Sequence, residues 1–270
     1  MQALNPEHKQ YILEHEDDLR TGDYKKFFSD KQFESGTGFY LYEAGIPFME
    51  NLGYVPARAF HTCEQLTNIV IPNNVTAIEA DAFCGCENLT KIDIPPSVNY
   101  IGGGAFSYCS SLTNVTIPRG IAIIEAYTFN DCNNLTRADI PEGVRTIENN
   151  AFSWCNNLSV VTIPNSVEEL GDHVFYACNN LESIVLPEGL TSIGDNAFAT
   201  CTKLSRANIP TSISYIGSGV FALCKKLHQI TYGGTVRQFK ELFEDMSPER
   251  CIGTECVIQC IDGAFKVAAY

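Results

Sequence analysis

Basic residues are scarce in this chain of 270 residues. Its 18 Lys and Arg stand against 32 Asp and Glu, which gives a formal net charge of −14 at pH 7. Proteins that bind nucleic acid present stripes of Lys and Arg to the phosphates, so we expect no nucleic-acid partner. The same shortage argues against attachment to anionic membrane surfaces. Proteins and glycans remain as the partner classes to consider.

Long apolar runs are also missing. No stretch of 18 apolar residues occurs, so we expect no membrane insertion. The first ten residues, Met1–Gln10, lack the basic segment and the apolar segment of a secretory signal. On this evidence we expect a cytoplasmic protein.

Catalytic signatures are absent as well. The chain contains no G-x-S-x-G, no P-loop and no H-E-x-x-H motif. Its five histidines are scattered, and we expect His61 and His173 to be surface residues rather than catalysts. We therefore predict a protein that is not an enzyme and uses no cofactor. An active site within residues 1–50 is kept as an alternative.

The chain is rich in one feature, a repeat of 23 residues that recurs eight times without an insertion. A Phe marks each repeat, a Cys follows three residues later, and a Leu follows three residues after the Cys. The phenylalanines are Phe60, Phe83, Phe106, Phe129, Phe152, Phe175, Phe198 and Phe221. The cysteines are Cys63, Cys86, Cys109, Cys132, Cys155, Cys178, Cys201 and Cys224. A constant period of this length indicates a solenoid in which each repeat is one coil.

One repeat, Ala82–Ala105, shows how a coil is expected to fold. Phe83, Cys86 and Leu89 are spaced as on one side of a short helical or 3₁₀ turn. The segment after Leu89 then alternates inward and outward as a strand does. Pro95 ends this strand, and Val98 and Ile101 send two more apolar side chains inward.

A single coil is predicted to be unstable alone. Its eight or so inward side chains contribute roughly 10–15 kcal/mol on burial. Ordering its backbone costs roughly 30 kcal/mol. Only stacked coils, which share backbone ladders and cover each other's flat sides, fold as a unit.

The pattern L-x-x-I-x-I-P-x-S-V-x-x-I-G-x-x-A-F-x-x-C-x-x-L resembles the BspA-like leucine-rich repeats over about residues 57–232. The resemblance implies a curved, right-handed leucine-rich repeat solenoid whose short parallel β-strands line the concave face. It also implies a binding role and, in contrast to the signal-peptide argument, a location at the cell surface or outside the cell.

The eight repeat cysteines are expected to be buried, reduced and packed as small hydrophobic side chains. A disulfide between stacked neighbours is disfavoured because their side chains run parallel, which makes the required torsion near 90° hard to reach. Cys84 is the cysteine expected to be exposed. Cys251, Cys256 and Cys260 lie outside the repeats. For these three we favour ordinary packing over a disulfide or a metal site, since structural zinc needs four ligands.

The two ends are predicted to cap the solenoid, giving three regions. Residues 1–50 form a mostly helical N-terminal cap, with helices beginning at Asn5 and spanning Asp23–Phe33. Residues 51–232 form the repeat array, with Tyr54–Pro56 as a turn before the first Phe. Residues 233–270 form the C-terminal cap, a helix beginning after Thr235 and a hairpin with Asp-Gly in its turn.

The outward positions of the predicted strands form three columns across the coils. They differ widely in charge and size, whereas the inward positions scarcely vary. This contrast is what a recognition surface needs, although solvated strand residues would look similar one at a time. The candidate binding residues are Lys91, Asp93, Arg137, Asp139, Arg206 and His228.

Two hypotheses on function follow. The first is a non-catalytic scaffold, expected to be a monomer, that binds a protein partner, or alternatively a glycan or host surface, on its strand face. The second is a structural or assembly module without a specific ligand.

Five Asn-x-Ser/Thr sequons, among them those at Asn134 and Asn157, follow from a repeat rich in these residues and are weak evidence for glycosylation.

Overall fold

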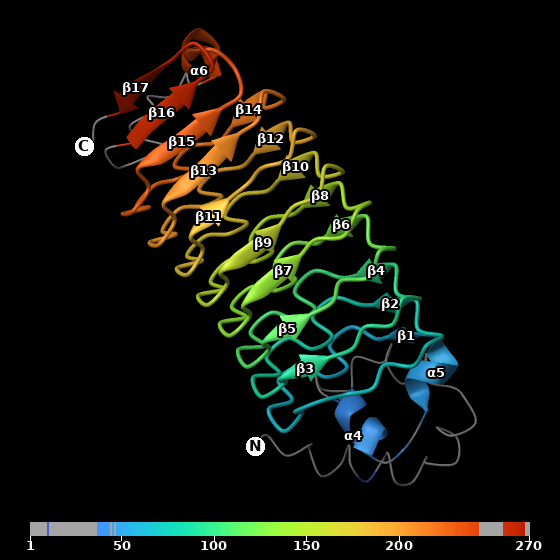
Figure 1. The fold of residues 1–270 in the computed structure, drawn as a ribbon. Coiled ribbons are helices and arrows are strands. Elements are labelled where there is room, and N and C mark those ends of the chain that lie inside the picture. The colour runs from blue at the N-terminus through green and yellow to red at the C-terminus, as the bar shows by residue number, and fades with distance from the viewer. Residues whose placement is uncertain (1–9, 11–36, 44, 46, 243–255, 268–270) are drawn as a thin grey trace.

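The computed structural model describes residues 10, 37–43, 45, 47–242 and 256–267. The helices predicted from Asn5 and over Asp23–Phe33, and Cys251, lie outside the described residues. The described residues form an elongated solenoid of stacked coils (Figure 1). The predicted fold, a leucine-rich repeat solenoid with short parallel strands, is confirmed.

One row of parallel strands, which we call the first ladder, forms where the sequence predicted strands. Its register follows the repeat, since Lys91 pairs with Asn114, Arg137 with Val160 and Arg206 with Gln229. Its strands pair in three groups, which are β3 (Lys91–Ile92) with β5 (Asn114–Val115), β7 (Arg137–Asp139) with β9 (Val160–Thr162), and β11 (Ser183–Ile184) with β13 (Arg206–Ile209) and β15 (Gln229–Tyr232). A bridge from Val70 to Asp93 extends the ladder to the first coil.

A second ladder of parallel strands runs beside the first (Figure 1). The sequence predicted only that the Val and Ile of these segments point inward. The turn predicted at Tyr54–Pro56 is wrong, because Tyr54–Val55 forms strand β1 and pairs with Ala77–Ile78. The other members are β2 (Ala77–Ile78), β4 (Tyr100–Ile101), β6 (Ile123–Ile124), β8 (Thr146–Ile147), β10 (Glu169–Leu170), β12 (Ser192–Ile193) and β14 (Tyr215–Ile216).

The segment around each repeat Phe forms the third side of the coil. In the first coil the amides of Ala59, His61 and Cys63 each donate to a carbonyl three residues back, as in 3₁₀ structure. The amides between them donate instead to the next coil, as the Phe60 amide does to the Ala82 carbonyl at 2.8 Å. The expected i→i+3 turns are therefore present, but they alternate with bonds between coils and make no continuous helix.

Left-handed residues produce this alternation. In every coil the residues two before and two after the repeat Phe have positive φ, as at Arg58 (59°) and Thr62 (55°). Glycine holds this conformation without strain, and Gly85, Gly104 and Gly219 occupy three of the sixteen positions. In the first seven coils, each left-handed residue donates its amide to a carbonyl of the following coil.

The core is a continuous column of the eight repeat phenylalanines, all of them buried. Neighbouring rings are stacked, with centroids from 4.9 Å apart for Phe60 and Phe83 to 5.6 Å apart for Phe198 and Phe221. Helices α4 (Thr37–Glu43) and α5 (Phe48–Leu52) lie beside the first coil, where the rings of Tyr42 and Phe48 contact Phe60.

The repeat cysteines are buried and free, as predicted. They also have a role that the sequence did not reveal. From the second coil onward each thiol donates to the carbonyl of the preceding coil's Phe, with Sγ–O distances from 2.9 Å (Cys86 to Phe60) to 3.3 Å (Cys178 to Phe152). Burial raises the pKa of every thiol in the row, to about 12 for Cys63 and for Cys224. Cys84, expected to be exposed, is half-buried.

The C-terminal elements form as the sequence predicted. Helix α6 (Val236–Leu242) begins with a capping box, in which the Thr235 hydroxyl accepts from the Gln238 amide and the Gln238 side chain accepts from the Thr235 amide. Strands β16 (Cys256–Cys260) and β17 (Gly263–Val267) form the antiparallel hairpin, and β16 extends the first ladder. Gly263 is already paired with Cys260, so Ile261 and Asp262 alone make the turn.

Candidate binding surface

The strand face consists of the outward side chains of the first ladder, in the three columns that the sequence predicted. In each strand an inward apolar residue such as Ile92 anchors the backbone, so the residues on either side point away from the core. The repeat register then places equivalent residues of successive coils side by side, about 5 Å apart.

The column that precedes each strand is largely occupied in holding the scaffold. The hydroxyls of Thr90, Thr113, Thr136, Ser159 and Ser205 each donate to the carbonyl of the equivalent residue one coil earlier, at 3.0–3.4 Å. These hydroxyls reinforce the backbone ladder. The sequence analysis placed this column in the variable recognition surface. Its residues in fact vary little, since all but Glu182 and His228 are Thr or Ser.

The other two columns carry the charged residues of the candidate site, paired within each coil. The Lys91 ammonium lies 2.9 Å from the Asp93 carboxylate, and the Arg137 guanidinium lies 2.5 Å from that of Asp139. The hydrogen bond from Arg137 lowers the pKa of Asp139. All four side chains are more than half exposed, so each pair contributes little to stability and remains available to a partner.

Arg206 and His228 lie further along the same face and are also exposed. None of the ion pairs among the described residues involves Arg206. Nδ1 of His228 donates to the Lys226 carbonyl at 3.1 Å, which leaves Nε2 facing outward as an acceptor when the ring is neutral. The six predicted residues thus share one face but form three groups along it.

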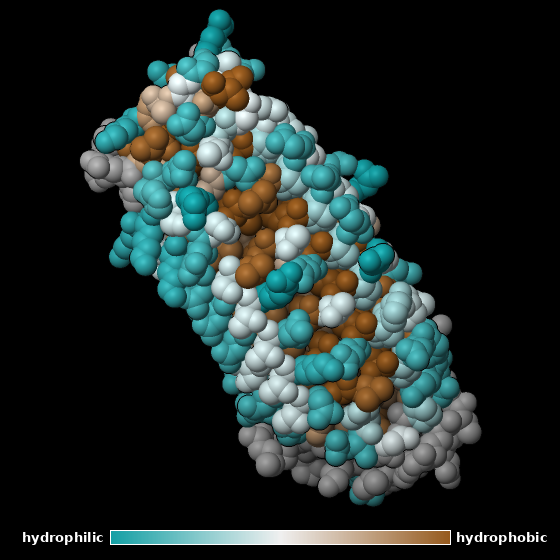
Figure 2. All heavy atoms as spheres, viewed as in Figure 1, coloured by the Kyte–Doolittle hydropathy of each residue, from teal (hydrophilic) through white to brown (hydrophobic). Residues whose placement is uncertain are grey.

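Exposed valines complete this face, and the sequence analysis did not choose them. Val70 and Val185 are each 71% exposed, and Val160 is 42% exposed. The sequence could have indicated these valines, because they are apolar residues at outward positions where other coils have polar ones. Figure 2 shows hydrophobic residues in a band along the long axis, interrupted by polar side chains. The surface therefore offers both charge pairs and apolar contacts.

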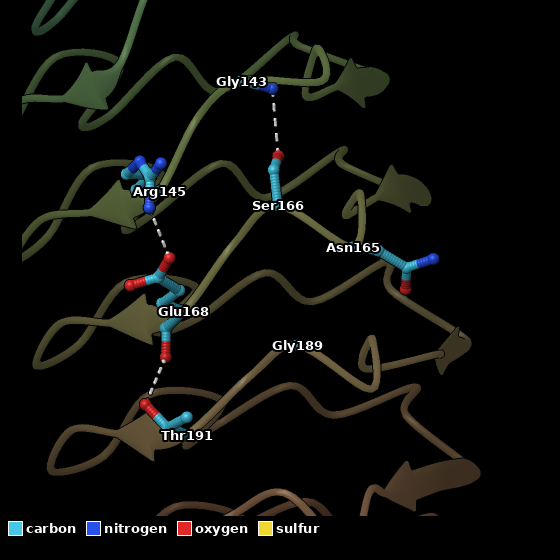
Figure 3. Close-up of a pocket in the computed structure, with 7 residues that line it drawn as sticks. All are labelled: Gly143, Arg145, Asn165, Ser166, Glu168, Gly189 and Thr191. Atoms are coloured by element: carbon cyan, nitrogen blue, oxygen red, sulfur yellow. Dashed lines mark hydrogen bonds and ion pairs between the residues drawn. The ribbon is translucent and has the colours of Figure 1, made fainter.

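A shallow pocket lies where three consecutive coils turn from the first ladder to the second (Figure 3). Most of its polar groups are bonded to one another. The Arg145 guanidinium lies 2.7 Å from the Glu168 carboxylate. The Gly143 amide donates to the Ser166 hydroxyl at 3.0 Å, and the Thr191 hydroxyl donates to the Glu168 backbone carbonyl at 3.0 Å. The Ser166 hydroxyl donates to the Val144 carbonyl at 2.8 Å and the Glu168 carboxylate is paired with Arg145, so these two side chains serve the scaffold.

Four of the five sequon asparagines make side-chain hydrogen bonds to another coil or to α5. The Asn157 side chain donates to that of Asn134 at 3.1 Å and accepts from that of Asn180 at 3.0 Å. A glycan on Asn157 would take the nitrogen that makes the first of these bonds.

His61 and His173, expected at the surface, are both half-buried, and burial lowers the pKa of His61.

Within the described part of the chain, no cluster of three His, Cys, Asp or Glu side chains is arranged to hold a metal ion. No described helix is both long and apolar enough to cross a membrane. Cys256 and Cys260 are buried on β16 as free thiols.

Comparison with known proteins shows the family. The model described as the BspA type leucine-rich repeat region matches residues 53–179 and 122–248, in six copies. A leucine-rich cell surface protein of Faecalibacterium prausnitzii is similar over 70% of this chain, with 33% identity and a TM-score of 0.53. A leucine-rich repeat protein of Bacteroides ovatus is similar over 76% of this chain, with 24% identity and a TM-score of 0.58.

These similarities cover 59% and 57% of the two solved chains, respectively. No curated protein matches the chain.

Proposed function

The chain belongs to the BspA-type leucine-rich repeat family, and we propose that it is a non-catalytic binding protein that holds a protein partner on its strand face. The observation that carries this proposal is the contrast between inward and outward positions of the first ladder. The inward positions are uniformly apolar and, apart from the half-buried Val161, buried, while the outward ones present charges, amides and exposed valines on one surface.

The contact residues we propose are Lys91, Asp93, Arg137, Asp139, Arg206 and His228, together with the exposed valines. Lys91 and Arg137 lie two coils apart, which is about 10 Å, so one partner can contact both. Each cation already has an acidic neighbour. A partner must therefore match alternating charges, which favours selectivity and association rate over raw affinity.

Charge reversal tests this proposal. The partner is isolated by pulldown with the full chain, and its association and dissociation rates are measured on Lys91→Glu, Arg137→Glu and the double variant. Each single change is expected to weaken binding modestly, mainly through slower association. The double change is expected to abolish it, because it leaves four adjacent carboxylates on the face.

The matched control is the double variant Arg119→Glu and Arg145→Glu. It makes the same change in net charge at exposed arginines outside the strand face, and it also places a new carboxylate beside an acidic residue, Glu168. Thermal melts check that all variants fold. If the strand-face double variant binds as wild type does, the proposed site is wrong; if no partner is captured, the alternative of an assembly module gains support.

A further inference from the structure

Aromatic side chains gather on a different surface of the coils. We call it the turn face, the outer side of the segments that flank each repeat Phe. Five rings lie there within four consecutive coils, namely Tyr108, Tyr127, Trp154, His173 and Tyr176. Tyr108, Tyr127 and Trp154 are each about half exposed. The strand face uses none of these residues.

Four of the five rings stand at the left-handed positions of their coils. The φ angles are 59° for Tyr108, 61° for Tyr127, 62° for Trp154 and 55° for His173. Bulky residues such as Tyr and Trp are disfavoured in this region of backbone space, whereas His occurs there more often. Equivalent positions elsewhere hold glycine, as at Gly85 and Gly104, so the turn itself does not need a ring. Costly conformations of this kind are typical of functional sites.

Three of the rings are in contact, and four are regularly spaced. Tyr176 contacts Trp154, with centroids 5.6 Å apart, and His173, with centroids 5.5 Å apart. Tyr108 and Trp154 occupy the same position two coils apart, and so do Tyr127 and His173. The spacing within each pair is about 10 Å, and the two pairs are offset by one coil. That spacing is close to the length of two extended sugar residues.

The groups between the rings indicate the chemistry of a ligand. Asp131 lies between Tyr108 and Trp154 in their column, and Asn150 lies between Tyr127 and His173. Together with the tyrosine hydroxyls and the indole N–H they offer both donors and acceptors. Sugar hydroxyls need both, while sugar C–H faces stack on aromatic rings. Asp131 and the net charge of −14 disfavour an acidic polymer.

We propose that the turn face binds a neutral, linear polysaccharide, with rings of alternate coils stacking on alternate sugars and Asp131 and Asn150 bonding to hydroxyls between them. This second site is independent of the protein partner proposed for the strand face. A repeating ligand fits because the rings repeat along the solenoid axis.

The chain contains a single tryptophan, Trp154, so its fluorescence reports on this surface alone. The full chain is titrated with neutral hexasaccharides: β-linked glucose, β-linked N-acetylglucosamine and α-linked glucose. We expect a saturable change in Trp154 emission with at least one of them. Poly-lysine serves as the competing probe, since rings beside a carboxylate also attract cations.

Tyr108→Gly and Tyr127→Gly remove a ring while relieving a left-handed backbone, so neither should lower the unfolding midpoint. Each is expected to weaken saccharide binding about tenfold, the loss of one stacking contact. Tyr108→Asn, which also tolerates this conformation, provides a second ring-free variant, and Tyr108→Phe should keep binding. Tyr215→Ala, which removes an exposed ring of the second ladder, is the matched control and should bind as wild type does.

The strand-face double variant should also keep saccharide binding, which separates this proposal from the first. The proposal is overturned if none of the three hexasaccharides gives a saturable change, if the ring-free variants bind them unchanged, or if only poly-lysine alters the emission.

Discussion

At the scale of single residues, each repeat Cys after the first does two things. Its side chain fills space in the core, and its thiol donates to a Phe carbonyl 26 residues earlier. The first role could be predicted from a small apolar residue at a constant position. The second role could not be predicted, because the thiol and the carbonyl belong to different coils. Their relative position is known only once the coils are stacked.

The buried thiols predict alkaline sensitivity. Burial raises their pKa in the native state, to about 12 for Cys63 and Cys224, whereas a thiol in the unfolded chain titrates near 8.5. The stability that this shift contributes is complete below about pH 8.5 and is lost as pH rises. Each buried thiol should lower the free energy of unfolding by about 1.4 kcal/mol for every pH unit above 8.5.

Denaturant unfolding in reductant at several values between pH 8 and 10 checks this prediction. Cys224→Ser is the control. It removes one thiol, so the free energy of unfolding should fall less steeply with pH by the contribution of that thiol. A free energy of unfolding that stays level over this range would show that the thiols are not protected from ionisation.

The Phe column predicts a large effect of a single truncation. Phe152 is fully buried and stacked between Phe129 and Phe175, at 5.2 and 5.5 Å. Phe152→Ala should cost about 3–5 kcal/mol of unfolding free energy, because the repeat register holds the neighbouring rings apart and the cavity cannot close. Chemical denaturation measures it, and a loss below about 1 kcal/mol would mean that the column is not the main support of the core.

At the scale of elements, the turn segment shows where sequence reasoning stopped. Spacing alone predicted a helical or 3₁₀ turn, whereas the left-handed residues direct every second amide to the next coil. A signal was present in the column two residues before each Phe. Six of its eight members are residue types that tolerate positive φ, namely Asp81, Gly104, Asn150, His173, Asn196 and Gly219.

The turn segment predicts opposite effects at two equivalent positions. Thr200 is β-branched with φ of 64°, and its buried hydroxyl has no hydrogen-bond partner among the described residues. Thr200→Gly should therefore raise the free energy of unfolding by about 1 kcal/mol. Gly85→Ala, at the same place in another coil, should lower it by about 1–2 kcal/mol, because φ is 74° and the new Cβ would lie 3.1 Å from Thr62.

Thermal melts of both variants compare these changes with wild type. Stabilisation by Gly85→Ala, or destabilisation by Thr200→Gly, would contradict the account of strain at this position.

At the scale of the whole molecule, the constant period was enough to predict the solenoid, its parallel strands and its Phe core. The second ladder escaped prediction because its strands are two residues long, too short for an alternating pattern to show. The strand face was predicted in outline. Which of its residues serve the scaffold was not, since the bonds of Thr113 or Asn208 to neighbouring coils leave no trace in the spacing of residues.

The architecture separates support from display. Ladders, turns and the Phe column hold each coil in register, so an outward residue can change without disturbing the core. This separation explains how the strand face and the turn face can carry different chemistry, with charge pairs and valines on one and rings in strained turns on the other.

Radical footprinting of the complex with its partner tests the central claim, binding through the strand face, most directly. Hydroxyl radicals label exposed aliphatic and aromatic side chains, and the protein has such groups on each of its surfaces. Val70 and Val185 report on the strand face, Leu223 on the turn face and Tyr215 on the second ladder. The account predicts that the partner lowers labelling at one or both valines and leaves Leu223 and Tyr215 unchanged. Protection of Leu223 or Tyr215 with both valines still fully labelled would contradict it.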